Sequence, residues 1–149
     1  MDLGYSLRPL EKGDYFCGYL RLLEQLTIVD SDCITFEEFS NQFDLMEKSG
    51  SMVWVYANQN ESIIGSATLL IEPKFIHLLS SVGHIEDVVV DGNYRGQNIG
   101  RLLTMHLTSI AKEKGCYKVT LNCSDENIGF YSKCNFIKNG NQMSIYFDR

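Results

Sequence analysis

The sequence carries little positive charge. Its 13 Lys and Arg residues are outnumbered by 19 Asp and Glu residues, so the formal net charge of the 149-residue chain is −6. A protein that binds nucleic acid over its whole surface has the opposite sign of charge. We therefore expect no nucleic-acid partner, and any anionic ligand has to be bound by a local site rather than attracted by the overall field.

Long apolar runs are also missing. No stretch of the sequence approaches the roughly 18 apolar residues that a membrane-spanning helix needs. The first residues, Met1–Tyr5, contain neither the basic nor the apolar region of a secretory signal. The sequence therefore predicts no membrane partner and a cytoplasmic location.

The cysteines lack the pattern of a disulfide framework or a zinc site. Their number is odd, and no two of them have CxxC spacing. Such cysteines are typical of reduced thiols in a cytosolic protein. The five are Cys17, Cys33, Cys116, Cys123 and Cys134. We expect no metal cofactor.

What the chain does contain is the composition of one ordinary globular domain. Hydrophobic residues make up 44% and charged residues 21%, with eight Phe and eight Tyr. A chain of this length buries roughly 68–70% of the surface that it exposes when unfolded. This balance excludes a disordered chain and a coiled coil, and we expect a single domain over residues 1–149.

Hydrophobic patterning predicts alternating strands and helices. Gly13 and Asp14 are expected to start a helix of about a dozen residues, and Thr35 and Glu38 form a capping box for a second helix that ends at Gly50. Two further helices are expected at residues 99–114 and 127–133. Strands are expected at residues 6–10, 52–57, 63–72, 83–90, 117–121 and 143–147. This order predicts an α/β fold, with a mixed central β-sheet flanked by helices.

The most informative stretch runs from Val82 to Arg101. A strand ends, a loop with glycine follows, and a long helix begins. Backbone N–H groups at a helix start lack intrahelical partners and lie at the positive end of its dipole, so they bind phosphate groups well. Gly96 and Gly100 would let an anion approach, and Arg95 adds charge. The alternative is a plain strand-to-helix turn with solvated arginines, and these residues alone do not decide between the two.

Glu86 and Asp87 interrupt the apolar strand before this loop. Successive side chains of a strand point to opposite faces, so at least one carboxylate points inward unless a β-bulge intervenes. A buried, unpaired carboxylate is costly and is usually kept for a purpose. The alternative is an exposed strand end with both acids solvated.

The loop Arg95–Gly100, with the sequence RGQNIG, resembles the R/Q-x-x-G-x-G/A loop of the GNAT superfamily of acetyl-CoA-dependent N-acetyltransferases. Asn98 replaces the first glycine of that motif, and asparagine tolerates a positive φ better than most residues. Within the superfamily, several segments resemble the glucosamine-6-phosphate N-acetyltransferases; they are residues 22–27, 71–77, 83–90, 115–121 and 127–133.

This resemblance implies a GNAT fold, a homodimer and acetyl-CoA as co-substrate. The implied reaction is direct attack by the 2-amino group of glucosamine 6-phosphate on the thioester, without a covalent acetyl-enzyme, on the route to UDP-N-acetylglucosamine. A bulge near Val88 would provide a backbone N–H for the thioester carbonyl. Implied catalytic residues are Glu86, Asp87 and Tyr131; implied acetyl-CoA contacts are Val88, Val89, Val90, Arg95, Gly96, Gln97, Asn98, Ile99, Gly100, Arg101, Asn127 and Tyr131.

The same resemblance implies a set of acceptor contacts, which are Thr27, Lys74, His77, Glu86, Asp87, Val88, Asn122 and Tyr146. Asn122 stands where the family usually has an acidic residue, and Tyr146 stands where it has an arginine. Arg149 or a cation of a partner subunit would then compensate for the missing arginine. Two other functions stay open: a GNAT enzyme for another small amine or a peptide N-terminus, and a non-catalytic module that senses acyl-CoA.

Overall fold

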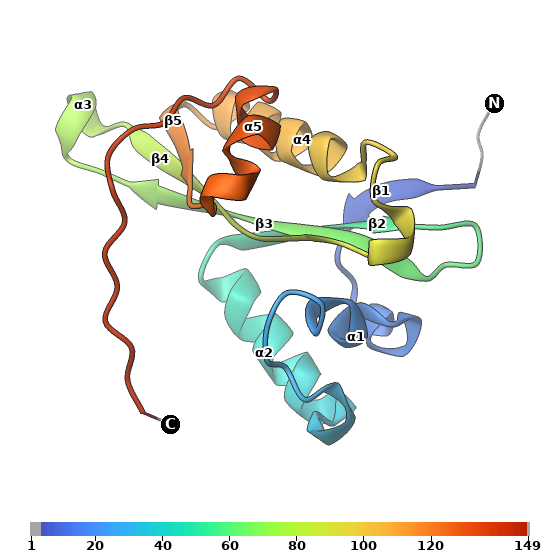
Figure 1. Ribbon diagram of the computed structural model, residues 1–149. Coiled ribbons are helices and arrows are strands. Elements are labelled where there is room, and N and C mark those ends of the chain that lie inside the picture. Colours follow the sequence, from blue (N-terminus) through green and yellow to red (C-terminus); the bar gives the residue numbers. More distant parts are fainter. Residues whose placement is uncertain (1–3, 149) are drawn as a thin grey trace.

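The computed structural model describes residues 4–148, and a single mixed β-sheet forms its centre (Figure 1). Its strands lie side by side in the order β1-β2-β3-β4-β5. The strands are β1 (Ser6–Pro9), β2 (Ser51–Ala57), β3 (Ile63–Pro73), β4 (Ser81–Val90) and β5 (Cys116–Leu121). Neighbouring strands from β1 to β4 are antiparallel, and β5 runs parallel to β4. The predicted α/β fold with a mixed central sheet is confirmed.

Helices cover both faces of this sheet, with α4 on one face and α1 and α2 on the other (Figure 1). The α-helices are α1 (Tyr19–Leu23), α2 (Phe36–Lys48), α3 (Ile76–Leu79), α4 (Ile99–Glu113) and α5 (Ile128–Ser132). The short 3₁₀ turns are η1 (Lys12–Cys17), η2 (Ser31–Cys33), η3 (Gly92–Tyr94) and η4 (Asp125–Asn127). In the described part of the chain, no helix is both long and apolar enough to cross a membrane.

Each face of the sheet has its own apolar core, because successive strand residues point to opposite faces. Ile63 packs with α1 and α2, whereas its neighbour Ile64 packs with α4. Leu103 and Leu107 of α4 are fully buried against the sheet. The central strands are therefore apolar on both faces, and polar residues within them need a specific explanation.

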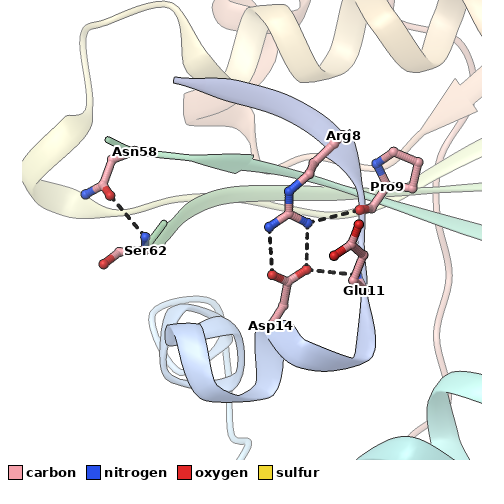
Figure 2. Close-up of polar contacts among 6 residues, drawn as sticks. All are labelled: Arg8, Pro9, Glu11, Asp14, Asn58 and Ser62. Carbon is pink, nitrogen blue, oxygen red and sulfur yellow. Dashed lines mark hydrogen bonds and ion pairs between the residues drawn. The ribbon is translucent and has the colours of Figure 1, made fainter. Parts of the chain in front are cut away.

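The single helix expected after Gly13 is wrong. Gly18 has a φ of 84° and separates the 3₁₀ turn η1 from the short helix α1. Asp14 does not start a helix; it is buried and accepts two hydrogen bonds from the Arg8 guanidinium, at 2.9 and 2.8 Å, and one from the backbone N–H of Glu11 at 2.8 Å (Figure 2). A buried carboxylate requires such partners, and here they fasten β1 to η1.

The prediction for the second helix is confirmed. The Thr35 hydroxyl accepts a hydrogen bond from the backbone N–H of Glu38, and the Glu38 carboxylate accepts one from the backbone N–H of Thr35. Gly50 follows the helix with a φ of 81°, a conformation that glycine adopts without strain. The helix start and stop are thus both local in origin.

The sixth strand, expected at residues 143–147, is wrong for the single chain. These residues form no strand and leave α5 as an extended segment that points away from the sheet (Figure 1). Met143 is 93% exposed, and Tyr146 is 91% exposed. An apolar, β-prone segment becomes a strand only where a sheet edge accepts it, and in residues 4–148 no edge does so. Arg149 lies outside the described residues.

Candidate active site

The two parallel strands at the centre of the candidate site separate halfway along β4. Their paired residues run from Ser81 and Cys116 to Ile85 and Leu121, and no pair is formed beyond that point in the described chain. The remainder of β4, from Glu86 to Val90, is paired with β3 alone. Its other edge therefore has backbone N–H and C=O groups that are free to bind a ligand chain.

A β-bulge lies at the start of this unpaired edge. Glu86 is opposite Thr68 and Val89 is opposite Ser66, so two residues of β4 face one residue of β3. Asp87, inside the bulge, has a φ of 52°. The bulge changes the alternation of side chains, and both carboxylates are exposed rather than one of them being buried. The inward-pointing carboxylate is therefore absent because the bulge intervenes.

A buried tyrosine that sequence reasoning missed lies next to the bulge. Tyr19 of α1 packs in the same core as Val89, and burial raises the pKa of its phenol to about 12. The negative charge of Asp87 raises this pKa further, whereas a contact with the Ser66 side chain lowers it. No spacing in the sequence links Tyr19 to Asp87, since the effect of this charge depends on how α1 packs on the sheet.

The loop between β4 and α4 presents backbone N–H groups to one side. Asn98 has a φ of 64° and occupies the N-cap position of α4, and Gly96 has a φ of 82°. The first hydrogen bond of the helix runs from the N–H of Leu102 to the carbonyl of Asn98, at 2.9 Å. The preceding N–H groups are left without helical partners, which is the arrangement that binds a diphosphate. Asparagine therefore adopts the left-handed conformation that the motif requires.

The two arginines of the loop differ in their surroundings. The Nε of Arg95 donates a hydrogen bond to the carbonyl of Val90 at 3.4 Å, so this side chain turns back toward the end of β4. Arg101 is exposed on the first turn of α4. Burial raises the pKa of the Cys134 thiol, and the positive charge of Arg101 lowers it by a smaller amount. Gln97 is exposed between them, and Ile99 is buried in the core.

Gly100 has a packing role in addition to the one expected from the sequence. A Cβ atom at this position would lie 3.2 Å from Cζ of Phe130 and 3.5 Å from Cγ2 of Val90. Such a contact is tighter than an ordinary van der Waals contact, so glycine lets α4 pack closely against α5. This packing brings the helix that carries Tyr131 next to the start of α4 and the preceding loop of residues 95–98, which is called the cofactor loop below.

Tyr131 is half-buried on α5, and burial raises the pKa of its phenol, with smaller effects of the Cys123 and Cys134 thiols in the same direction. A raised pKa keeps the hydroxyl protonated and able to donate a hydrogen bond. Asn127 precedes α5, is exposed and makes no capping hydrogen bond with its side chain. Asn122 follows the last paired residue of β5, so it lies next to the point where β4 begins its bulge.

Lys74 and His77, the two expected acceptor contacts that could bind the phosphate of the sugar, lie elsewhere in the chain. Lys74 Nζ is paired with Glu72 Oε1 at 2.9 Å, and His84 Nε2 lies 2.9 Å from the same oxygen. Hydrogen bonds from Lys74 and His84 lower the pKa of the Glu72 carboxyl. His77 stacks on Tyr117 with ring centroids 3.9 Å apart. Lys74 and His77, in the hairpin between β3 and β4, thus have partners of their own, which are Glu72 of β3 and Tyr117 of β5.

This hairpin is far from the bulge. Ser81 is opposite Pro73 at its base, and Glu86 follows roughly 17 Å further along the strand at about 3.4 Å per residue. Tyr146 lies on the exposed C-terminal segment, and Thr27 is exposed after the end of α1. One chain therefore brings together the expected cofactor contacts and carboxylates, but not the expected phosphate contacts. Over residues 4–148, no three His, Cys, Asp or Glu side chains are grouped as metal ligands.

Comparisons with known proteins agree with this geometry. Residues 10–136 match the family model described as the acetyltransferase (GNAT) family. The chain is 40% identical over 149 residues to glucosamine 6-phosphate N-acetyltransferase 1 of Dictyostelium discoideum, covering 98% of this chain and 93% of that protein.

Two solved structures are similar over nearly their whole length. The crystal structure of glucosamine-6-phosphate N-acetyltransferase from Arabidopsis thaliana is 37% identical, with a TM-score of 0.92, and the match covers 97% of this chain and 99% of that one. An acetyltransferase from Trypanosoma brucei is 40% identical, with a TM-score of 0.91 and coverage of 96% and 99%.

Proposed function

Because this chain belongs to the acetyltransferase (GNAT) family and is therefore an acetyl-CoA-dependent N-acetyltransferase, we propose that its acceptor is the 2-amino group of glucosamine 6-phosphate. One observation carries the proposal. The exposed pair Glu86 and Asp87 lies in a bulge on an unpaired strand edge, in a chain about 40% identical to glucosamine 6-phosphate N-acetyltransferases over most of its length.

The residues of the loop fit coenzyme A. The unpartnered N–H groups before Leu102, with Gly96 and Asn98 in left-handed conformations, suit its diphosphate. The free edge of β4 from Val88 to Val90 suits the amide groups of the pantetheine arm of coenzyme A. The side-chain amide of Asn127, at the start of α5, is exposed and can form a further hydrogen bond with the cofactor. Bound acetyl-CoA supplies the acetyl group as a thioester.

The carboxylates of the bulge act on the amine. An amine attacks only in its neutral form, and an amine with a pKa near 7.7–8.0 needs only mild help from a base. Glu86 and Asp87 orient the ammonium group and accept its proton, directly or through water. The backbone N–H at Val88, freed by the bulge, polarises the thioester carbonyl. Asn122 adds a hydrogen bond at the same place but no charge.

Tyr131 provides the proton at the other end of the reaction. Burial raises the pKa of its phenol, so the hydroxyl is protonated at neutral pH and can donate to the departing sulfur. The route without a covalent acetyl-enzyme is supported by the positions of the cysteines and histidines. Cys134 is buried and Cys123 is exposed, and the described residues show no hydrogen bond between a cysteine and a histidine. The three histidines lie at the hairpin, in β4 beside Glu72 and on α4 against Trp54.

We further propose that the phosphate of the acceptor is bound across a homodimer. The hairpin segment α3 contains three successive left-handed residues, and Leu78 within it and Phe75 just before it are 99% and 93% exposed. Left-handed conformations cost roughly 1–2 kcal/mol for each residue other than glycine, so such a segment requires stabilising contacts. The apolar C-terminal segment with Tyr146 is unpartnered in the single chain. A second copy would cover both and bring Lys74, His77 and Tyr146 to a site.

The product of this reaction, N-acetylglucosamine 6-phosphate, would belong to the cytoplasmic route to UDP-N-acetylglucosamine. The test is release of CoA thiol with glucosamine 6-phosphate, compared with unphosphorylated glucosamine and a panel of amino acids, polyamines and peptide N-termini. We expect kcat/KM to be highest for the phosphosugar by at least tenfold. Preference for another amine would reject the acceptor, and binding of acetyl-CoA without transfer to any amine would reject catalysis.

A further inference from the structure

The turn η3, which leads into the cofactor loop, is held from behind by two side chains that are distant in sequence. The N–H of Gly92 donates a hydrogen bond to Oε1 of Gln25 at 2.9 Å, and Nδ2 of Asn58 donates one to the hydroxyl of Tyr94 at 3.1 Å. The two partners come from the end of α1 and from the hairpin between β2 and β3. Both ends of the three-residue turn are therefore attached to other elements.

A cavity of about 530 Å³ lies behind this turn, between α1 and the β2–β3 hairpin. Gln25, Asn58, Asp91 and Tyr94 are among the residues that line it. Gly92 and Asn93 are exposed on the turn itself. The turn is also supported by the backbone N–H of Asp91, which donates a hydrogen bond to the carbonyl of Ile64 at 2.8 Å, and by the Tyr94 ring, which packs at the edge of the core beneath α4. The two side-chain contacts add to these supports and fix the turn on the cavity side.

The Asn58 amide is itself well oriented. Its Oδ1 accepts hydrogen bonds from the backbone N–H groups of Asn60 and Ser62, at 2.9 and 3.0 Å, and the second of these is drawn in Figure 2. With the oxygen engaged in the hairpin, Nδ2 is the group directed to Tyr94. The hairpin therefore provides a rigid anchor, which makes the contact a positional constraint rather than a loose surface bond.

The consequence follows from the chain order. Tyr94 is directly followed by Arg95 and Gly96. Gly96 has a left-handed conformation and is the first residue of the row of backbone amides before α4. A shift of η3 would therefore turn those amides. We propose that Gln25 and Tyr94 are positioning residues, which hold η3 so that the amides of the cofactor loop point at the diphosphate of acetyl-CoA. This inference rests on the proposed use of that loop for acetyl-CoA.

The same contact links the two halves of the site. Gln25 precedes Thr27, the acceptor contact implied by the family resemblance, by two positions at the end of α1. Gln25 therefore ties the end of α1 to the turn before the cofactor loop. Loss of the contact should weaken acetyl-CoA binding more than acceptor binding, because the hydrogen bond is made by the backbone of Gly92, in the turn before the cofactor loop.

The test uses Gln25→Met, which keeps the length of the side chain and removes the acceptor oxygen, and Tyr94→Phe, which removes one hydroxyl. Gln59→Met, on an exposed hairpin glutamine, is the matched control. Titration calorimetry with acetyl-CoA alone should show a Kd increased about 3- to 10-fold in each of the two variants, as loss of one hydrogen bond predicts, and unchanged in the control. At saturating acetyl-CoA, kcat should stay within twofold of the wild-type value.

If Gln25 and Tyr94 only stabilised the fold, the variants would have a lower melting temperature and a lower kcat, instead of a raised Kd with an unchanged kcat. The inference is overturned if both variants bind acetyl-CoA with the wild-type Kd, or if kcat falls while Kd is unchanged. Since calorimetry uses no amino sugar, the result does not depend on the acceptor. A wild-type protein that binds acetyl-CoA but does not acetylate glucosamine 6-phosphate would reject the proposed acceptor. The Kd values of the variants for acetyl-CoA could still be compared and would still test the role of Gln25 and Tyr94.

Discussion

The candidate site has a cofactor half, formed by β4, the cofactor loop and α5, and an acceptor half, formed by the two carboxylates and the expected contacts of the phosphosugar. The two halves differ in how many of their residues a single chain brings together. The cofactor half surrounds the free edge of β4, and Gly100 packs α5 against the start of α4 to complete it. The acceptor half has its carboxylates in place, but Lys74 is in a distant hairpin and Tyr146 is on an exposed segment. We therefore expect a single chain to be sufficient for acetyl-CoA binding, whereas phosphosugar binding should require two chains.

The largest effect is expected at the bulge, where both halves meet. Glu86→Gln and Asp87→Asn each remove a proton acceptor that the amine requires, so kcat/KM for glucosamine 6-phosphate should fall about 10²- to 10⁴-fold. The Kd for acetyl-CoA should change less than twofold in calorimetry. Glu126→Gln, an exposed acid of η4, serves as the control. Equal loss of acetyl-CoA binding would assign the carboxylates to the cofactor half.

Removal of residues 141–149 tests the acceptor half directly. Loss of one or two polar phosphate contacts should lower kcat/KM for the phosphosugar about 10- to 100-fold and leave acetyl-CoA binding within twofold. Mixing this truncated chain with Glu86→Gln chains should restore activity, because the intact segment of one subunit would serve the intact bulge of the other. Absence of recovery in mixed samples that form dimers would show that the segment acts within its own chain.

Tyr131→Phe should lower kcat about 10-fold, at or below the low end of the range for a general acid, since a thiolate is a good leaving group. The Kd for acetyl-CoA should be unchanged, because the ring still packs between Phe130 and Phe136. Steady-state kinetics at saturating acetyl-CoA measure this. A variant with the wild-type kcat would remove Tyr131 from the mechanism.

A smaller effect is expected from Gly100→Ala. The new methyl group would lie 3.2 Å from Cζ of Phe130, so α5 has to shift by a few tenths of an ångström. The Kd for acetyl-CoA should rise roughly 2- to 5-fold, as expected when about one hydrogen bond to the cofactor is weakened. The control is Gly129→Ala, where no atom lies within 4 Å of the added Cβ. The same Kd in both variants would show that α5 does not support the cofactor half.

The smallest effect on turnover is expected from Tyr19→Phe, which concerns the pH dependence of stability. Burial raises the pKa of the folded phenol to about 12, whereas an unfolded tyrosine has a pKa near 10. The neutral phenol thus stabilises the folded state fully below pH 10, and this contribution is lost as the pH rises from about 10 to about 12.

Two pKa units correspond to about 3 kcal/mol, so wild-type stability should fall by up to that amount over this window, and the variant should lack this part of the decline. Urea unfolding at pH 8 and pH 11 measures the difference. The same decline in both proteins would show that Tyr19 ionises as readily in the folded as in the unfolded state. Turnover at neutral pH should be the same in both, since neither protein has an ionised group at this position there.

Local features were predictable where their cause lies within a few residues. The capping box of Thr35 and Glu38 depends on neighbours three positions apart. Likewise Asn98 and Gly96 adopt positive φ within one short loop. The family resemblance of RGQNIG rests on the same kind of local geometry, and the acetyltransferase assignment made from it is confirmed.

Features that depend on distant contacts were missed or wrong. The helix expected after Gly13 is divided at Gly18, which has a φ of 84°, and Asp14 is bonded to Arg8 of β1 instead of starting a helix. The segment at 143–147 was expected to form a strand, but whether it pairs depends on a sheet edge, and within residues 4–148 no edge pairs with it. Tyr19 beside Asp87 and Gln25 bonded to Gly92 leave no trace in the spacing of the sequence.

The sequence was sufficient for the capping box of α2, the glycine that follows this helix and the left-handed conformation of Asn98, because each follows from the backbone preferences of adjacent residues. The tertiary structure alone decided that β4 and β5 part after Ile85, that two carboxylates emerge together from one bulge, and that α5 rests on Gly100. Those outcomes depend on which strands and helices compete for the same contacts, and that competition is settled only when the whole chain packs.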